Sequence, residues 1–244
     1  MKKPRPTKIF ALLFFVFFAQ ITFAQGPFEN GRTFKIAIVI PESDFGKFTN
    51  GLGQPDSTGT IPYQHVEAYV GLGVQFGKMY FLNWLNEEET MKLGIDVTWF
   101  GFSYLQQHVQ EYIPNSPVPS HYKIIEHITA YVEVGPFISY MLSESMAIDF
   151  STKLTPTIGF MGGGDSKSPK PLEGENWRMG TGYGLRFTPA LYFRYNKFLI
   201  GAEYSAGNLS FNYNVQNYGR TYPSDYESGT SPYSTLRIVL GKKF

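Results

Sequence analysis

The feature that most constrains the fold of this chain is an alternation of apolar and polar residues with a period of two. Every second residue from Met146 to Phe160 is apolar apart from Thr152, whereas the positions between them include Asp149 and Lys153. Successive side chains of a β-strand point to opposite faces, so this pattern predicts a strand with one apolar and one polar face.

Segments of the same kind recur along the chain, separated by connections of alternating length. We place eight strands near residues 33–40, 65–80, 90–105, 122–141, 146–160, 179–195, 197–213 and 232–244. Long polar connections are expected at 41–64, 106–121, 161–178 and 214–231, and short ones near 81–89, 142–145 and 195–197. Outer-membrane barrels have this asymmetry, with short periplasmic turns and longer extracellular loops. The sequence therefore predicts an all-β fold: a closed antiparallel transmembrane β-barrel of eight strands.

In such a barrel the apolar face meets lipid and the polar face lines the interior. The inward positions include five acids and five bases, and we expect these ten residues to form the lumen charges: Lys35, Glu67, Asp96, Glu133, Asp149, Lys153, Arg186, Arg194, Glu203 and Arg237. Eight strands leave an interior just wide enough for side chains to fill, so the charges should pair and plug it. Inward glycines would make room for the rings of Tyr69, Phe100, Tyr131, Phe137 and Tyr192. The alternative is that the charges line an ion path.

The first residues of the chain have a different character. Four cations precede an uncharged apolar run from Ile9 to Ile21, and small residues precede Gln25. This layout predicts a secretory signal peptide over residues 1–24, because the run is too short for a spanning helix. The barrel domain would then occupy residues 25–244.

Composition excludes several classes of function. Without the four cations of the predicted signal peptide, the net charge falls from +1 to about −3, and no basic stripe follows, so we expect no nucleic-acid partner. The chain has no cysteine, which excludes disulfides, thiolate chemistry and a lipoprotein anchor.

The chain resembles the small outer-membrane β-barrel proteins of Gram-negative bacteria, of the OmpA/OmpX-like size class. Its first strand runs into residues 40–46, Ile-Pro-Glu-Ser-Asp-Phe-Gly, which is similar to the opening of many such barrels from Bacteroidota-type genomes. Its last strand, from Tyr233 to Phe244, resembles the terminal strand that the barrel-assembly machinery reads, with aromatic Phe244 in last place. The resemblance implies an outer-membrane location, lipid around the wall, and Phe244 as an assembly signal.

Residues that could carry chemistry are few. His65 and His127 with Glu67 could meet near the outer mouth, but their spacing carries no metal signature, so we predict no metal site and no cofactor. Pro136, Pro156 and Pro189 lie on three consecutive predicted strands, although proline normally avoids strand interiors. We interpret them as local bulges; a lateral entry for lipid is the alternative.

The leading functional hypothesis is a non-enzymatic barrel that presents surface loops for adhesion, envelope integrity or an extracellular or envelope partner. The alternatives are a lipid-modifying enzyme of the acyltransferase or deacylase kind, a narrow channel, and a secretion-system subunit. We predict no catalytic residue, since no His, Ser and acid converge on one rim. A soluble, lipocalin-like barrel becomes the best account if the mature chain needs no detergent.

Overall fold

A computed structural model describes residues 30–42, 63–82, 90–112, 121–165, 176–217 and 220–244 of the chain. Within these ranges the regular structure consists of β-strands alone. The strands are β1 (Gly31–Pro41), β2 (Tyr63–Ala68), β3 (Gly71–Phe81), β4 (Met91–Tyr112), β5 (His121–Ser143), β6 (Met146–Asp165), β7 (Asn176–Tyr195), β8 (Phe198–Asn217), β9 (Arg220–Pro232) and β10 (Thr235–Lys243). No helix in the described part of the chain is long and apolar enough to cross a membrane. The predicted signal peptide lies outside the described residues.

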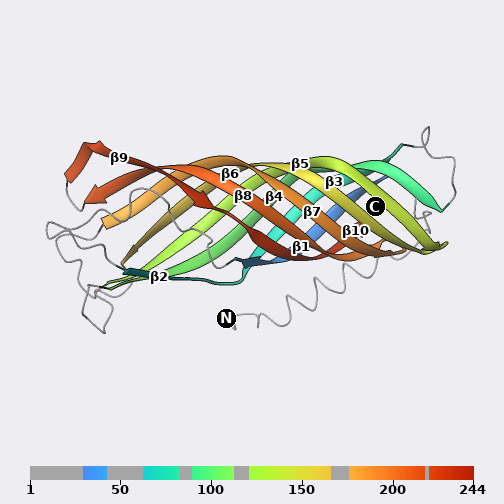
Figure 1. Cartoon of the computed structure of the whole chain (residues 1–244), viewed down its shortest axis with the longest axis horizontal. Coiled ribbons are helices and arrows are strands. Elements are labelled where there is room, and N and C mark those ends of the chain that lie inside the picture. The colour runs from blue at the N-terminus through green and yellow to red at the C-terminus, as the bar shows by residue number, and fades with distance from the viewer. Residues whose placement is uncertain (1–29, 43–62, 83–89, 113–120, 166–175, 218–219) are drawn as a thin grey trace, which may run out of the picture.

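The strands pair antiparallel in an unbroken ring (Figure 1). From β3 to β8 each strand pairs with the next, β3 also pairs with β1, and β10 joins β1 to β8. Such a ring leaves no free edge along these strands. The two remaining strands extend the ring at one end, where β2 pairs with β4 and β9 pairs with β8.

The strands are longer than the sequence pattern predicts. β4 continues to Tyr112, β6 continues to Asp165, and β9 occupies residues that we expected to lie in a loop. The predicted long connections at 106–121, 161–178 and 214–231 are therefore wrong over these stretches. Alternation weakens there because strands that carry polar residues on both faces lose the apolar signal.

The two short connections that are described agree with the prediction. A turn at Glu144 and Ser145 joins β5 to β6, and a turn at Asn196 and Lys197 joins β7 to β8. Asn196 has a φ of 53°, a left-handed conformation that asparagine tolerates better than most residues.

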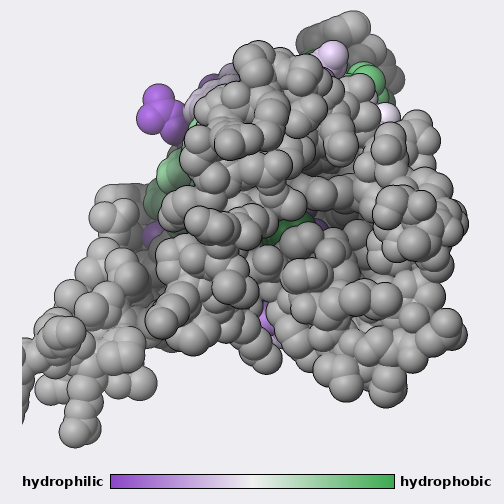
Figure 2. All heavy atoms as spheres, turned by 90° about the vertical axis from the view of Figure 1, so that its left-hand side faces the viewer, coloured by the Kyte–Doolittle hydropathy of each residue, from purple (hydrophilic) through white to green (hydrophobic). Residues whose placement is uncertain are grey.

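Side chains alternate between a buried interior and an exposed outer wall. On β1 the buried residues are Thr33, Lys35, Ala37 and Val39, whereas Ile36 and Ile38 are 44% and 49% exposed. The other ring strands also bury polar residues and expose large apolar ones, the reverse of the arrangement in a soluble protein. In the view onto the β9 end, hydrophobic residues lie on the flank of the molecule beside hydrophilic ones (Figure 2).

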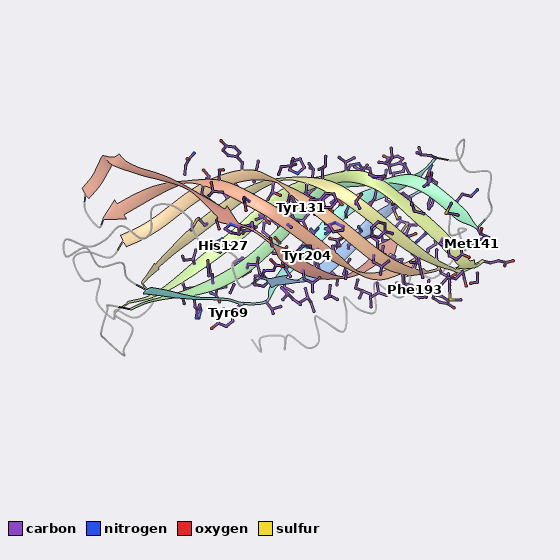
Figure 3. The ribbon with its side chains drawn as sticks, in the orientation of Figure 1. Tyr69, His127, Tyr131, Met141, Phe193 and Tyr204 are labelled. Carbon is purple, nitrogen blue, oxygen red and sulfur yellow. The ribbon has the colours of Figure 1, made fainter. Side chains whose placement is uncertain are left out.

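Two aromatic residues that we expected in the interior lie on the outer wall. Tyr69 is 44% exposed and projects away from the ribbon (Figure 3). It lies with Val70 in the break between β2 and β3, where two consecutive residues are exposed and the alternation is interrupted. Phe100 is 49% exposed, because a bulge in β4 between Thr98 and Gly101 turns both Trp99 and Phe100 outward. The predicted inward positions of Tyr69 and Phe100 are therefore wrong.

The three strand prolines all lie away from the interior, and each stands beside a gap in the pairing. Pro136 and Pro156 pair with β4 and β7 respectively, but the β5–β6 pairing skips both residues. Pro189 pairs with β6, whereas the β7–β8 pairing skips it. Proline has no N–H to donate, so each gap falls on the side where that donor is missing.

Candidate functional site: the charged interior

The described interior is filled by charged side chains in its middle and by apolar ones toward both ends. Nine of the ten predicted lumen residues are buried, with exposed fractions of 3% or less: Lys35, Asp96, Glu133, Asp149, Lys153, Arg186, Arg194, Glu203 and Arg237. The strand pairing brings them together from all sides of the ring. The tenth, Glu67, lies on β2 at a position where only the backbone is described.

Six of these residues form what we call the central charged cluster: Lys35, Lys153 and Arg237 with Asp96, Glu133 and Glu203. Lys153 lies at its centre, with its Nζ 2.6 Å from Glu133, 3.4 Å from Glu203 and 3.6 Å from Asp96. The Lys35 Nζ lies 3.7 Å from Asp96 and 3.5 Å from Glu203. The Arg237 Nη2 lies 2.6 Å from Glu133 and 2.7 Å from Glu203. Three cations therefore face three carboxylates.

Uncharged side chains complete the central charged cluster. The Tyr192 hydroxyl accepts a hydrogen bond from the Lys35 Nζ at 2.9 Å and donates one to Glu203. The Gln75 Nε2 donates to Glu203 at 2.8 Å, and the Thr98 hydroxyl donates to Glu133 at 3.1 Å. Buried charges need such partners, because desolvation costs several kcal/mol for each ion unless hydrogen bonds compensate it. Sequence reasoning identified the charges but assigned no role to Gln75 or Thr98, which occupy inward positions by the same alternation.

A separate ion pair lies between β6 and β7, on the side of the central charged cluster nearer the short turns. The Arg194 guanidinium donates from Nε and Nη2 to the two oxygens of Asp149, at 2.7 and 2.9 Å. It also donates to the Ser139 hydroxyl at 2.8 Å. This two-point geometry is the strongest form of an ion pair between arginine and a carboxylate.

Arg186 lies on the other side of the central charged cluster and makes contacts of a different kind. Its Nε donates to the Thr157 hydroxyl at 2.9 Å. Its Cζ lies 5.4 Å from the ring centre of Tyr131 and 5.8 Å from that of Tyr233. None of the ion pairs among the described residues includes it.

Beyond Arg186 the described interior continues with apolar and weakly polar side chains. Leu105, Leu209, Phe211 and Tyr233 are almost completely buried there. His127 is also buried, and its Nε2 is 2.7 Å from the Gln107 Oε1 (Figure 3). The side chain of His65 lies outside the described residues, and among the described ones no group of three potential metal ligands forms. At the opposite end Met79, Phe81 and Phe137 make a smaller apolar cluster.

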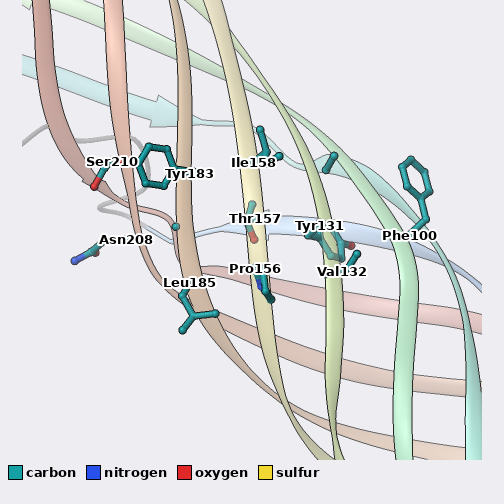
Figure 4. A pocket seen from close by; sticks show the side chains of 12 residues that line it. Phe100, Tyr131, Val132, Pro156, Thr157, Ile158, Tyr183, Leu185, Asn208 and Ser210 are labelled. Carbon is teal, nitrogen blue, oxygen red and sulfur yellow. The ribbon is translucent and has the colours of Figure 1, made fainter.

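The outer wall carries a shallow pocket of about 800 Å³ at Pro156 (Figure 4). Outward residues of five strands line it, including Phe100, Val132, Tyr183 and Leu185. The pocket lies over two gaps in the strand pairing. Between β5 and β6, residues 132–133 and 155–156 are unpaired. Between β7 and β8, residues 184–185 and 208–209 are unpaired. Its lining is predominantly apolar, which fits an acyl chain better than a polar substrate.

Comparison with known proteins gives little beyond the geometry. No protein-family model matches the chain, and no curated protein matches it. Among solved structures the chain is similar to Ail, the attachment invasion locus protein of Yersinia pestis, with 12% sequence identity and a TM-score of 0.34. The match covers 88% of this chain and 97% of that one.

Proposed function

We propose that the ring is an eight-stranded transmembrane β-barrel of a bacterial outer membrane, with a plugged interior and no enzymatic activity. It would present its loops for adhesion, envelope integrity or the binding of an extracellular or envelope partner. The observation that carries the proposal is the inverted polarity of the wall. Charges are buried inside, and large apolar residues are exposed around the outside.

The height of the apolar band supports a membrane span. On β5 the exposed large apolar residues run from Val132 to Leu142, and on β7 they run from Tyr183 to Tyr195. A transmembrane strand needs about 9–11 residues, so each band is long enough to cross a bilayer. Soluble monomers rarely expose contiguous apolar patches of this extent.

The strands beyond this band support a role at the surface. β5 has 23 residues, so the half that precedes Val132 would project from the membrane as paired sheet. The projecting part carries hydrogen-bonded polar groups on its outer face, such as the Tyr104 hydroxyl 3.1 Å from Glu126. A rigid stalk that lifts the loops away from the lipid surface suits contact with a partner.

The direct test is membrane partition of the mature chain. We expect it to fractionate with outer membranes, to need detergent for extraction, and to migrate differently on gels before and after heating. Recovery of a soluble monomer without detergent would contradict the proposal and favour the soluble, lipocalin-like barrel.

Assembly is expected to depend on the last strand. If Phe244 is the signal read by the assembly machinery, Phe244→Ala should reduce the folded fraction in cells more than in refolding from urea into detergent. Equal loss in both settings would assign Phe244 a packing role in place of recognition.

The wall pocket favours one second candidate, a lipid-modifying enzyme that takes an acyl chain at Pro156. Incubation of the purified barrel with labelled phospholipid or lipid A separates the two functions. Acyl transfer or release that is lost in a Pro156→Val variant would replace the non-enzymatic proposal with this one.

A further inference from the structure

The outer wall is hollowed at the pocket beside Pro156 (Figure 4). Small residues contribute to its lining, among them Ala130 and Gly184. Larger outward side chains stand around them, since Tyr183 and Leu185 are 66% and 58% exposed. A volume of about 800 Å³ lies within the range of small-molecule pockets, about 300–1,000 Å³. The hollow is therefore large enough for part of a lipid.

The pocket spans the boundary between the apolar band and the polar extension of the strands. On β8, Tyr204 is the last described large apolar residue that is exposed, and the outward positions beyond it include Asn208 and Ser210, which are exposed and polar. Both line the pocket, and Ser210 pairs with Tyr183. Figure 4 shows Asn208, Ser210 and Tyr183 together on one side of the pocket. We call these three side chains the polar margin.

The polar margin carries no charge. Its groups are an amide, an alcohol and a phenol, and none of the residues that line the pocket is an acid or a base of the ionised kind. The three side chains form no hydrogen bond within the described part of the chain, so their donors are available. Uncharged donors suit the ester carbonyls at the head of an acyl chain, whereas a phosphate is bound best by arginine or lysine.

The extension beyond the pocket carries a negative charge on its outer face. Glu126 is exposed on β5, four residues from Ala130, which lines the pocket. That spacing is about 13 Å at the usual rise of a strand. Among the described outward residues that lie beyond the pocket on β5 to β8, Glu126 is the only one with a charge. A carboxylate at this level attracts an ammonium group and repels a head group that carries several phosphates.

We propose that the wall pocket binds one diacyl phospholipid with an ammonium head group, of the phosphatidylethanolamine class. One acyl chain lies in the hollow beside Pro156, the polar margin donates hydrogen bonds to its ester carbonyl, and the ammonium group lies on the side of Glu126. The lipid is held without reaction, so the site does not need the activity of a lipid-modifying enzyme. The proposal rests on the membrane location proposed above, because the lipid reaches the pocket from the bilayer around the wall.

The test is retention of lipid by the full mature chain, refolded in detergent micelles and measured by native mass spectrometry. The two probes are dipalmitoyl phosphatidylethanolamine and its dialkyl ether analogue, which lacks the ester carbonyls. We expect one bound molecule of the ester lipid and about tenfold weaker retention of the ether analogue, because the polar margin then has no carbonyl to bind.

Variants separate the pocket from the rest of the wall. Ala130→Phe fills the hollow, so retention of the ester lipid should fall by about tenfold. The matched control is Ala202→Phe, the same substitution at an outward β8 position that does not line the pocket, and its retention should stay unchanged. A triple variant with Asn208→Leu, Ser210→Ala and Tyr183→Phe keeps the hollow without the polar margin, so it should retain both probes equally.

Equal retention of the ester lipid by the unmodified chain and Ala130→Phe would overturn the proposal and show that lipid binds the wall at no particular place. Displacement of the phospholipid by an equal concentration of lipid A would overturn the choice of head group. If the triple variant fails to fold, the comparison of ester and ether lipids in the unmodified chain decides the role of the polar margin. Because binding is measured in micelles, a chain that fractionates with outer membranes but retains no phospholipid loses this site alone.

Discussion

Single residues in the interior are constrained by charge and by volume. The Arg194–Asp149 pair shows the first constraint, because both groups are 1% exposed and each is the other's ionic partner. Glycine shows the second. A side chain at Gly101 would meet the ring of Tyr131, which fills the interior at that level.

Loss of one member of the isolated ion pair should be costly. Arg194→Met leaves Asp149 charged and buried, so we expect a loss of about 3–5 kcal/mol in the free energy of unfolding. Adding Asp149→Asn should recover most of that loss. Urea unfolding followed by tryptophan fluorescence measures both variants, and a double variant no more stable than the single one would refute the pairing.

A bulky residue at Gly101 should disturb the interior. Gly101→Val forces the Tyr131 ring to move, with an expected cost of about 1–3 kcal/mol. Gly162 is the matched control, since a Cβ at that position has no atom within 4 Å. The same urea series measures both, and equal stability of the two variants would contradict the predicted crowding.

Single strands show how the wall combines an apolar band with a polar extension. On β5, Ile138 lies within the exposed apolar band, and Glu126 lies beyond it on the extension. The same substitution at these two outward positions should therefore have different consequences.

An arginine within the band should oppose insertion. Ile138→Arg is expected to cost about 2–4 kcal/mol in a lipid bilayer, whereas Glu126→Arg should cost about 0–1 kcal/mol. Refolding yield into vesicles, compared with yield into detergent, measures the difference. Equal yields for the two variants would place the membrane elsewhere on the molecule.

The prolines interrupt strands that are otherwise continuous. Pro156→Val restores an N–H on the β5 side of β6, so the skipped pairing at residues 132–133 should form. Slower amide exchange at Val132 and at position 156 measures the gain. Leu154→Val, at a position that already pairs with Val134, is the control and should leave exchange unchanged. Unaltered exchange in Pro156→Val would mean that the gap has another cause.

At the scale of the whole molecule, the closed ring and the filled interior argue against conduction. The central charged cluster, the Arg194–Asp149 pair and buried apolar side chains, from Leu209 and Phe211 at one end to Phe81 and Phe137 at the other, occupy the described interior. We therefore expect no water-filled path beside these side chains, because an eight-stranded barrel is just wide enough for side chains to fill.

Purified protein in a planar bilayer should therefore show no steady conductance. A 16-stranded porin provides the positive control for insertion and recording. Steady, ohmic current from this chain would contradict the plugged interior and favour a narrow channel.

The sequence by itself determined which face of the ring strands is buried, except in β4 beyond its bulge. The period of two is a property of the strand backbone, so the inward positions of Lys35, Glu133 and Arg237 follow from spacing alone. The short turns at Glu144 and Asn196 follow in the same way from polar residues between two alternating segments.

Only the tertiary structure decided which charges meet. Pairing depends on the stagger of strands that are far apart in sequence, such as the 104 residues that separate Glu133 from Arg237. The bulge that turns Phe100 outward, the extra length of β4 and β6, and the strand β9 also depend on neighbouring strands, so the alternation does not reveal them. The alternation likewise shows ten inward charges in balance, and the structure buries nine of them, whereas the side chain of Glu67 lies outside the described residues.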